Sequence, residues 1–382
     1  MIPLLGPCNA YLYPMRILLL LGIALVSSFN PLSASIFLSD SIQNDTVKRS
    51  SFLVIPIVYF TPETQWAGGA GGVYTFRFPQ EPDTTQASQL TFGGAYTQLR
   101  QVLSYISGRL YWGEENNVAY GEVGYYIYNY FFYGVGNGAT ADQEELYGVR
   151  FPRFRLNYLR QLSPHWYGGF RYWYDGYDIT EKAEGGALVT GSVSGSQGGT
   201  VSAFGLVANY DTRDNIFWPK AGTFLEVASL VHAPWTGSDY RYRRLSVDAS
   251  QFFTLPWWDH RLALNYWTDL TFGDPPFNDM AMLGGPKKMR GLYQGRYLDK
   301  QLMMLQAEYR LPIVWRFRAV AFGSIGGVAS ELSEFAQVPL RYTYGAGLRF
   351  LMDKTNQVNI RFDVGFDPEG VPAYYLTVGE AF

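Results

Sequence analysis

The sequence predicts an all-β fold, a transmembrane antiparallel β-barrel of about sixteen strands. The composition is the first observation behind this prediction: aromatic residues make up 17% of the chain, glycine occurs 41 times, and only 16% of residues are charged, against about 25% in soluble domains. The second is a mean hydropathy close to neutral, because in a membrane barrel only alternate strand residues face lipid. The third is the period-two alternation of apolar and polar residues.

Alternation is clearest in the C-terminal half of the chain. Along 358–366, Ile360 and Phe362 lie on one face while Arg361 and Asp363 lie on the other, because successive side chains of a strand point in opposite directions. The polar faces carry Arg, Asp, Asn, Ser and Gly, which suits a wet barrel lumen better than the surface of a soluble sandwich. The segments with the same pattern are 244–253, 301–311, 341–350 and 358–366.

Sixteen strands are predicted, and an even number is expected for a bacterial barrel. The connections near 163–164, 255–258 and 312–314 are short and fall on one side, whereas the two longest, about 181–198 and 273–300, share the other side. The predicted strands are 51–61, 66–79, 87–97, 100–112, 117–130, 145–162, 165–177, 199–211, 222–232, 240–254, 259–272, 301–311, 315–328, 340–351, 356–366 and 372–382.

The N-terminal segment reads as a secretory signal. Met15-Arg16 offers a second start, and the apolar run that follows ends near the small residues Ser33-Ala34-Ser35, which favours a cleaved signal peptide over 1–34, with an uncleaved anchor as the alternative. Residues 35–50 then form a short periplasmic extension and 51–382 the barrel. The sole cysteine, Cys8, lies upstream of the mature part, so no disulfide framework or thiolate metal site is expected.

Several classes of function are disfavoured by the sequence. The formal net charge is −3 and no basic run is present, so nucleic acid is not an expected partner. The three histidines, His165, His232 and His260, stand in no nucleophile motif, so we expect no enzyme, no metal and no cofactor. The glycine-rich stretches 68–72 and 134–138 lack a surrounding βαβ unit and do not predict a phosphate loop.

Three segments carry a resemblance to a known family. The first has Asp211, Arg213 and Asp214 in a turn, followed by Pro219-Lys220-Ala221-Gly222; the second is the tip Met289-Arg290-Gly291-Leu292-Tyr293; the third is the end, in which Tyr374, Leu376 and Val378 alternate ahead of Phe382. Together they resemble the BamA/TamA family of outer-membrane proteins, also called the bacterial surface antigen family. The space before the first strand holds no POTRA domain, so the chain is similar to a short member without one.

The resemblance implies a site. In the family the long sixth outer loop folds into the lumen and its arginine docks on inward-facing residues, and alternation places Glu308 and Asp363 inward. Ser324 stands where the family often has the aspartate that receives the arginine, and it is a further expected acceptor. The expected loop-six lock therefore comprises Arg290, Gly291, Tyr293, Glu308, Ser324 and Asp363. The end of the chain resembles the family's assembly signal, formed here by Tyr374, Leu376, Val378 and Phe382.

The resemblance also implies a function in the bacterial outer membrane. That function is the assembly of outer-membrane proteins, protein translocation or lipid handling, with outer-membrane lipids and other outer-membrane or periplasmic proteins as partners. The alternative is a passive or plugged barrel with no assembly role, in which Arg290 only pins the loop. The first strand is interrupted by Pro56, and because proline cannot donate to a ladder, we expect this edge to pair poorly.

Overall fold

A computed structural model describes residues 49–61, 65–256, 259–354 and 357–382 of the 382-residue chain. The predicted signal peptide, 1–34, and nearly all of the predicted extension, 35–50, lie outside the described residues. The strands and loops that follow belong to a single unit, Lys48–Phe382.

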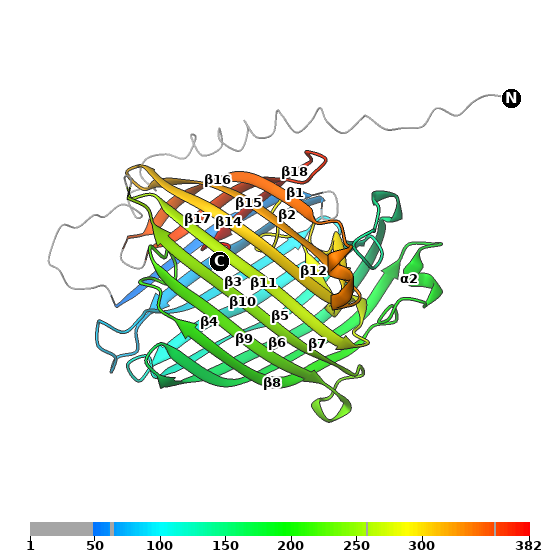
Figure 1. Cartoon of the computed structure of the whole chain (residues 1–382), viewed down its shortest axis with the longest axis horizontal. Helices are drawn as coiled ribbons and strands as arrows, with labels where there is room; N and C mark the ends of the chain where they lie inside the picture. Colours follow the sequence, from blue (N-terminus) through cyan, green and yellow to red (C-terminus); the bar gives the residue numbers. More distant parts are fainter. Residues whose placement is uncertain (1–48, 62–64, 257–258, 355–356) are drawn as a thin grey trace. The chain divides into compact units, whose positions relative to one another are not determined.

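Sixteen strands form one antiparallel sheet in which each strand pairs with its neighbours in the chain (Figure 1). The sheet curls into a barrel, and a separate two-stranded sheet, β12 with β13, lies in the connection between β11 and β14. The large sheet comprises β1 Ser50–Thr61, β2 Gln65–Phe76, β3 Ser88–Thr97, β4 Val102–Trp112, β5 Asn117–Phe132, β6 Glu145–Ser163, β7 Trp166–Lys182, β8 Gly199–Asp211, β9 Gly222–His232, β10 Tyr242–Thr254, β11 Arg261–Gly273, β14 Gln301–Val314, β15 Phe317–Ala329, β16 Arg341–Asp353, β17 Val358–Phe366 and β18 Pro372–Val378.

The connections differ in length between the two ends of the barrel. We name the end that carries the connections 164–165, 315–316 and 354–357 the turn side; the long connections 183–198 and 274–300 lie at the opposite end, as predicted. Short helices occur within the connections, and no helix among the described residues is long and apolar enough to cross a membrane. They are η2 Ala141–Gln143, α2 Ala187–Thr190, η3 Pro234–Thr236, η4 Phe277–Asp279 and η5 Leu332–Ala336.

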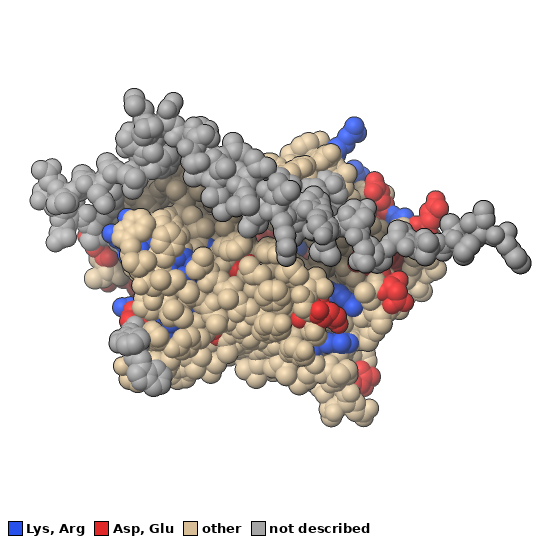
Figure 2. Space-filling view, turned by 90° about the horizontal axis from the view of Figure 1, so that it is seen from above, with Lys and Arg blue, Asp and Glu red and all other residues tan. Residues whose placement is uncertain are grey.

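The two faces of the sheet have the predicted chemistry. On β16, Leu348 is half exposed, whereas its neighbour Arg349 is fully buried, and on β17 Phe362 is exposed while Asp363 is buried. Figure 2 shows a broad area of uncharged residues on one face of the barrel, with charged side chains mostly nearer its ends. An apolar outer band with a polar interior is the arrangement of a membrane barrel.

The first strand corrects one expectation. β1 is twelve residues long and pairs with β2 without a register shift, and Pro56 lies opposite Ala70. The expected interruption at Pro56 is therefore wrong. Proline is tolerated in a ladder only where its missing N–H would point away from the partner strand. The missing hydrogen-bond donor of Pro56 therefore faces the free edge of β1. Among the described residues no ladder joins β1 to β18, the two end strands of the order.

The last strand is shorter than predicted. The sequence predicts a strand over 372–382, but β18 ends at Val378. Gly379 has a φ of +83°, a left-handed conformation that glycine adopts without a steric penalty. The four last residues therefore leave the sheet, and alternation does not continue to Phe382.

Candidate functional site

The connection 274–300, here called loop six, folds inward and contributes a large part of the core. Leu283, Met289 and Arg290 are completely buried, and Leu292 is nearly so. Within the loop, β12 (Ala281–Leu283) pairs with β13 (Tyr297–Asp299), so its two arms run side by side. The tip can reverse direction because its four glycines adopt positive φ; they are Gly284, Gly285, Gly291 and Gly295.

Arg290 at the tip of loop six binds two carboxylates on different strands. Its Nη1 donates to Asp363 on β17 at 2.6 Å, and its Nη2 donates to Glu308 on β14 at 2.8 Å. All three side chains are fully buried. The guanidinium also lies over the ring of Phe322 on β15, 3.7 Å from its centre, which adds a cation–π contact. One loop side chain therefore contacts three strands.

The same carboxylates hold further arginines. Glu308 also accepts from Arg310 at 2.7 Å, and Asp363 accepts from Arg349 at 2.5 Å. Arg349 in turn donates to Glu380 at 2.7 Å. We name the complete set the docking network: Arg290, Arg310, Arg349, Arg361, Glu308, Asp363 and Glu380.

Four guanidiniums and three carboxylates give the docking network a formal charge of +1. Each is at most a few per cent exposed; Glu380 is the most exposed at 4%. Removing charges from water is costly, and only close, well-directed pairing offsets that cost. Loss of a carboxylate would raise the net charge to +2, whereas loss of Arg290 would leave the network neutral.

The backbone of loop six contacts the backbone of β17 at a point where each of the two segments has a glycine. A Cβ on Gly365 would lie 2.7 Å from the carbonyl carbon and oxygen of Arg290, and a Cβ on Gly291 would lie 2.6 Å from the carbonyl oxygen of Phe366. Tyr375 on β18 completes the contact, since its hydroxyl accepts from Gly291 N at 3.1 Å and donates to Leu292 O at 3.2 Å. The loop tip is thus attached to the last two strands.

Tyr293 binds the opposite wall of the lumen. Its hydroxyl accepts a hydrogen bond from the backbone N of Phe131 at 3.2 Å, and its ring packs on Phe131 and Tyr133. Phe131 lies on β5, the fifth strand of the sheet order, whereas Glu308 lies on β14, the twelfth. Loop six therefore bridges the barrel interior, and Tyr293 holds the loop at a wall other than the one that carries the acceptors of Arg290.

A second anchor holds the beginning of loop six. Asp279 in η4 accepts from the hydroxyl of Tyr242 at 2.5 Å and pairs with Arg244 at 3.1 Å, both on β10. Burial acts to raise the pKa of Asp279, but Arg244 and, less strongly, His232 outweigh it and hold this pKa below its ordinary value. Asp279 therefore stays charged, and the pairing with Arg244 persists, at neutral pH.

Ser324 does not take the place of the aspartate expected at its position. Its Oγ is buried and has no hydrogen-bond partner among the described residues. A serine hydroxyl is too short to bridge the space that a carboxylate would fill, and Glu308 and Asp363 already occupy both ends of the Arg290 fork. The expectation of a bond between Ser324 and Arg290 is therefore wrong.

The predicted turn motif lies between β8 and β9, on the turn side. Arg213 forms a two-pronged ion pair with Asp211, at 2.9 and 2.6 Å, and lies 4.3 Å over the ring of Phe224. Asp214 accepts from the backbone N–H groups of Lys220 and Ala221. These bonds order the turn itself: Asp211, Arg213 and Asp214 pair with one another and with the turn backbone, not with Arg290.

The four residues of the expected assembly signal are divided between two places. Tyr374 and Leu376 are exposed on the outer face of β18, 50% and 63% respectively. Phe382 lies beyond the turn at Gly379, with its ring 5.8 Å from the guanidinium of Arg310 and its main-chain oxygen accepting from the same residue at 3.2 Å. Phe382 therefore lies outside β18, which was predicted to extend to it, and the role of the segment in assembly stays a prediction.

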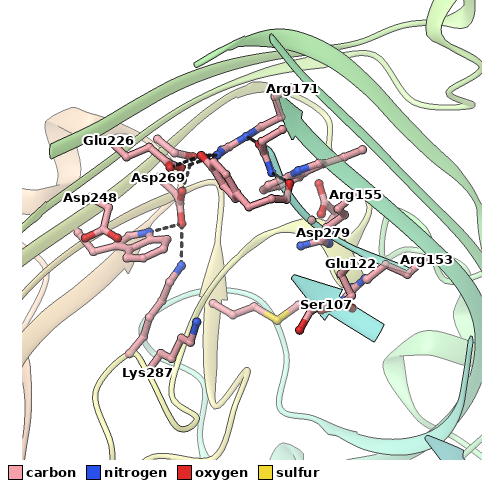
Figure 3. A pocket seen from close by; sticks show the side chains of 18 of the residues that line it. Ser107, Glu122, Arg153, Arg155, Arg171, Glu226, Asp248, Asp269, Asp279 and Lys287 are labelled. Atoms are coloured by element: carbon pink, nitrogen blue, oxygen red, sulfur yellow. Dashed lines mark hydrogen bonds and ion pairs between the residues drawn. The ribbon is translucent and has the colours of Figure 1, made fainter. Parts of the chain in front are cut away.

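A polar cavity of about 720 Å³ occupies the lumen beside loop six, which forms one of its walls. Figure 3 shows Arg171 bound to Glu226, and Lys287 of loop six directed into the same space as Asp248. Lys288 pairs with Asp269 at 2.9 Å. The described residues contain no cluster of His, Cys, Asp or Glu suited to a metal ion. The cavity is therefore a chamber lined by charged side chains and bounded by the loop.

Several residues of the site were not singled out from the sequence. Arg349, Arg361 and Tyr375 all stand at inward positions of predicted strands, and that position was the available signal. Gly365 could not have been recognised, because its role depends on the path of a loop that is distant in the chain. What the docking network can do is hold or release one loop inside a membrane barrel; it contains no arrangement of nucleophile and base.

The fold and this interior loop define a class of protein, the bacterial outer-membrane β-barrel whose lumen is occupied by its own sixth loop. The sequence pattern of the Omp85 superfamily domain matches residues 108–382. The chain therefore belongs to the Omp85 superfamily, which includes the BamA/TamA proteins that the three motifs resemble.

Solved structures show the same fold at low sequence identity. BamA from Haemophilus ducreyi lacking POTRA domains 1–3 is 13% identical with a TM-score of 0.53, and the match covers 86% of this chain and 69% of that one. CdiB from Acinetobacter baumannii is 13% identical with a TM-score of 0.56, over 87% of this chain and 59% of that one. CdiB from Escherichia coli is 15% identical with a TM-score of 0.57, over 86% and 61%.

The match to the CdiB structures is only partial in length. This chain spans about three fifths of the length of each CdiB structure. No curated protein matches the sequence. The interpretation of the chain as a member without POTRA domains rests on residues outside the described part and stays a prediction.

Proposed function

We propose that this protein assists the insertion or translocation of other proteins at the bacterial outer membrane, with loop six as the element that is docked and released. The observation that carries the proposal is Arg290, a loop side chain fully buried between Glu308 and Asp363. Membership of the Omp85 superfamily supports the same function. Lipid handling by the same barrel belongs to this proposal.

The docking network is placed where it can control the end of the sheet. The tip of loop six touches β17 through Asp363 and β18 through Tyr375. β18 has only seven residues and pairs with β17 alone among the described strands. A docked loop therefore stabilises the strands beside the free edge, and release of Arg290 would loosen them. That coupling is the proposed link between the loop and membrane insertion.

The second candidate is a plugged barrel with no assembly role. It is favoured by the extent to which loop six fills the lumen, since Met289, Arg290 and Leu283 are completely buried and the tip is held by both walls. In this candidate Arg290 is only a structural pin. The two candidates differ in whether other proteins depend on this chain.

Depletion of the protein from its native cells distinguishes the candidates. The assembly function predicts that other barrel proteins disappear from the outer membrane, that wild-type protein restores them, and that Arg290→Ala restores them poorly even when its own level is matched. Quantitative proteomics of isolated outer membranes measures the levels of the other barrel proteins and of this protein. Conductance of the purified protein in planar bilayers is the companion measurement. Unchanged outer-membrane composition together with higher conductance of Arg290→Ala would support the plugged barrel.

A further inference from the structure

A second cavity lies at the turn-side mouth of the barrel, away from loop six. It has a volume of about 240 Å³ and is lined by the ends of β11, β14 and β15 together with the β8–β9 turn. The cavity is large enough for a small oxyanion. The residues that line it are Trp218, Asp259, Arg261, Arg310, Leu311, Pro312, Ile313, Val314, Trp315, Phe317 and Arg318.

Trp218 forms the floor of this mouth cavity. The turn is shaped so that its tryptophan enters the barrel: Asn215 Oδ1 accepts hydrogen bonds from the backbone N of Phe217 and of Trp218, both at 2.8 Å. The indole is only 3% exposed and packs with Val320 and Phe322 of β15. A rigid aromatic face is therefore fixed beneath the opening.

Three guanidiniums gather on this one indole. Their central carbons lie 4.6, 4.8 and 5.5 Å from the ring centre for Arg318, Arg310 and Arg261 respectively. Asp259 is the one carboxylate in the described lining, and it pairs with Arg261 at 2.8 Å. Arg310 is already paired with Glu308 outside the lining, so the remaining two cations and one anion leave the site a formal charge of +1. Like charges this close repel, and burial weakens the screening by water.

The hydrogen-bonding capacity of these arginines is also incomplete. Arg261 is 5% exposed, and its Nε and Nη1 have no partner among the described residues; Arg310 is 1% exposed, and its Nη1 has none. Within the described part of the chain, Arg318 donates to two neutral oxygens, those of Asn359 and Gln357. Buried polar groups without partners are costly, so the site is electrostatically unbalanced as it stands.

We propose that the mouth cavity binds a phosphate group. A phosphate carries between one and two negative charges at neutral pH and several strong acceptor oxygens, which match the charge of the lining and the planar forks of its arginines. The group can come from a phospholipid headgroup or from free inorganic phosphate. The exposed Ile313, Val314 and Trp315 at the rim offer an apolar surface to lipid chains.

The test is a titration of the purified, folded barrel in neutral detergent with inorganic phosphate, followed by calorimetry. We expect saturable binding by wild type. The double variant Arg261→Gln and Arg318→Gln should bind at least about tenfold more weakly, a loss easily resolved in a dissociation constant. Arg310 is left unchanged because it also belongs to the docking network. Arg160→Gln, an exposed arginine on the same side, is the matched control and should bind like wild type.

Two further arms keep the test decisive. Asp259→Asn removes the one lining carboxylate, so it should tighten phosphate binding without depending on any loss of folding. Short-chain phosphatidylglycerol is then compared with an uncharged diacylglycerol of the same chains. Displacement of phosphate by the phospholipid at lower concentration than phosphate itself identifies the headgroup as the source; the reverse order identifies free phosphate. The proposal is overturned if neither phosphate nor the phospholipid binds saturably, or if the double variant binds phosphate as tightly as wild type.

Discussion

Two charge networks in the same lumen differ mainly in their contact with water. The docking network around Arg290 is fully buried at its centre, where Arg290, Glu308 and Asp363 are all 0% exposed. A second network, here called the cavity network, joins Arg153, Arg155, Glu122 and Asp175 on β5, β6 and β7. There the arginines are 21% and 25% exposed and Glu122 is 27% exposed, although Asp175, which both arginines share, is only 2% exposed.

The same residue types therefore have different structural roles in the two networks. Ion pairs that water can reach contribute about 0–1 kcal/mol, whereas removal of one partner of a buried pair costs about 3–5 kcal/mol. The docking network therefore determines the position of loop six. The cavity network mainly keeps a wet chamber charged.

The largest effect is expected for Glu308→Gln. The substitution leaves four guanidiniums facing two carboxylates, so the free energy of unfolding should fall by about 3–5 kcal/mol. Denaturant unfolding followed by tryptophan fluorescence measures the change, and gel mobility without boiling reports the folded fraction. Glu122→Gln in the cavity network is the matched control and should cost much less. Equal costs for the two variants would remove the distinction between the networks.

Arg290→Ala should have the next largest effect. Glu308 and Asp363 each keep another arginine, so the loss is that of hydrogen bonds between charged groups, about 1.5–3 kcal/mol. Arg290→Lys should recover only part of it, because an ammonium cannot form the two-pronged contact. The released tip should also become sensitive to trypsin at Lys287 and Lys288. A variant with wild-type stability and a protected loop would show that Arg290 does not hold the tip.

Gly365→Ala tests the close approach of loop six to β17 without changing any charge. The added methyl would meet the Arg290 carbonyl at 2.7 Å, and overpacking of this kind costs about 1–3 kcal/mol. Gly323→Ala on β15 is the control, since its Cβ would meet its nearest neighbour at 3.8 Å. The same unfolding measurement applies. If both alanines were tolerated alike, the loop would have room to move away from β17.

The smallest effect is expected in the cavity network. Arg155 pairs with Asp175 at 2.6 Å but is a quarter exposed, and Asp175 keeps Arg153. Arg155→Gln should therefore change the free energy of unfolding by about 0–1 kcal/mol, and by less at high salt, where screening weakens the pair. Unfolding curves at low and high salt test both points. A cost as large as that of Glu308→Gln would show that the chamber is drier than its exposure indicates.

The strands and the faces of their side chains could be predicted from the sequence. Side-chain direction alternates with period two along any strand, so the inward positions of Glu308 and Asp363 and the outward positions of Leu348 and Phe362 followed from local pattern alone. Most strand boundaries were predictable to within a few residues for the same reason, but β7 runs to Lys182, beyond its predicted end at 177, and β18 stops at Val378, short of its predicted end at 382. There a single glycine, Gly379, ends the strand through a backbone conformation that the alternation does not encode.

The contacts between inward-facing residues depend on the three-dimensional path of the chain. Arg290 and Asp363 are 73 positions apart, and their contact depends on the path of loop six and on the stagger of the strands around the barrel, which no local pattern records. The same stagger leaves Ser324 without a partner, carries Tyr293 to the opposite wall, and requires Gly365 where the loop backbone passes. It also brings Trp218 from a turn into the barrel mouth, because the arginines that surround the indole come from strands that follow it in the chain.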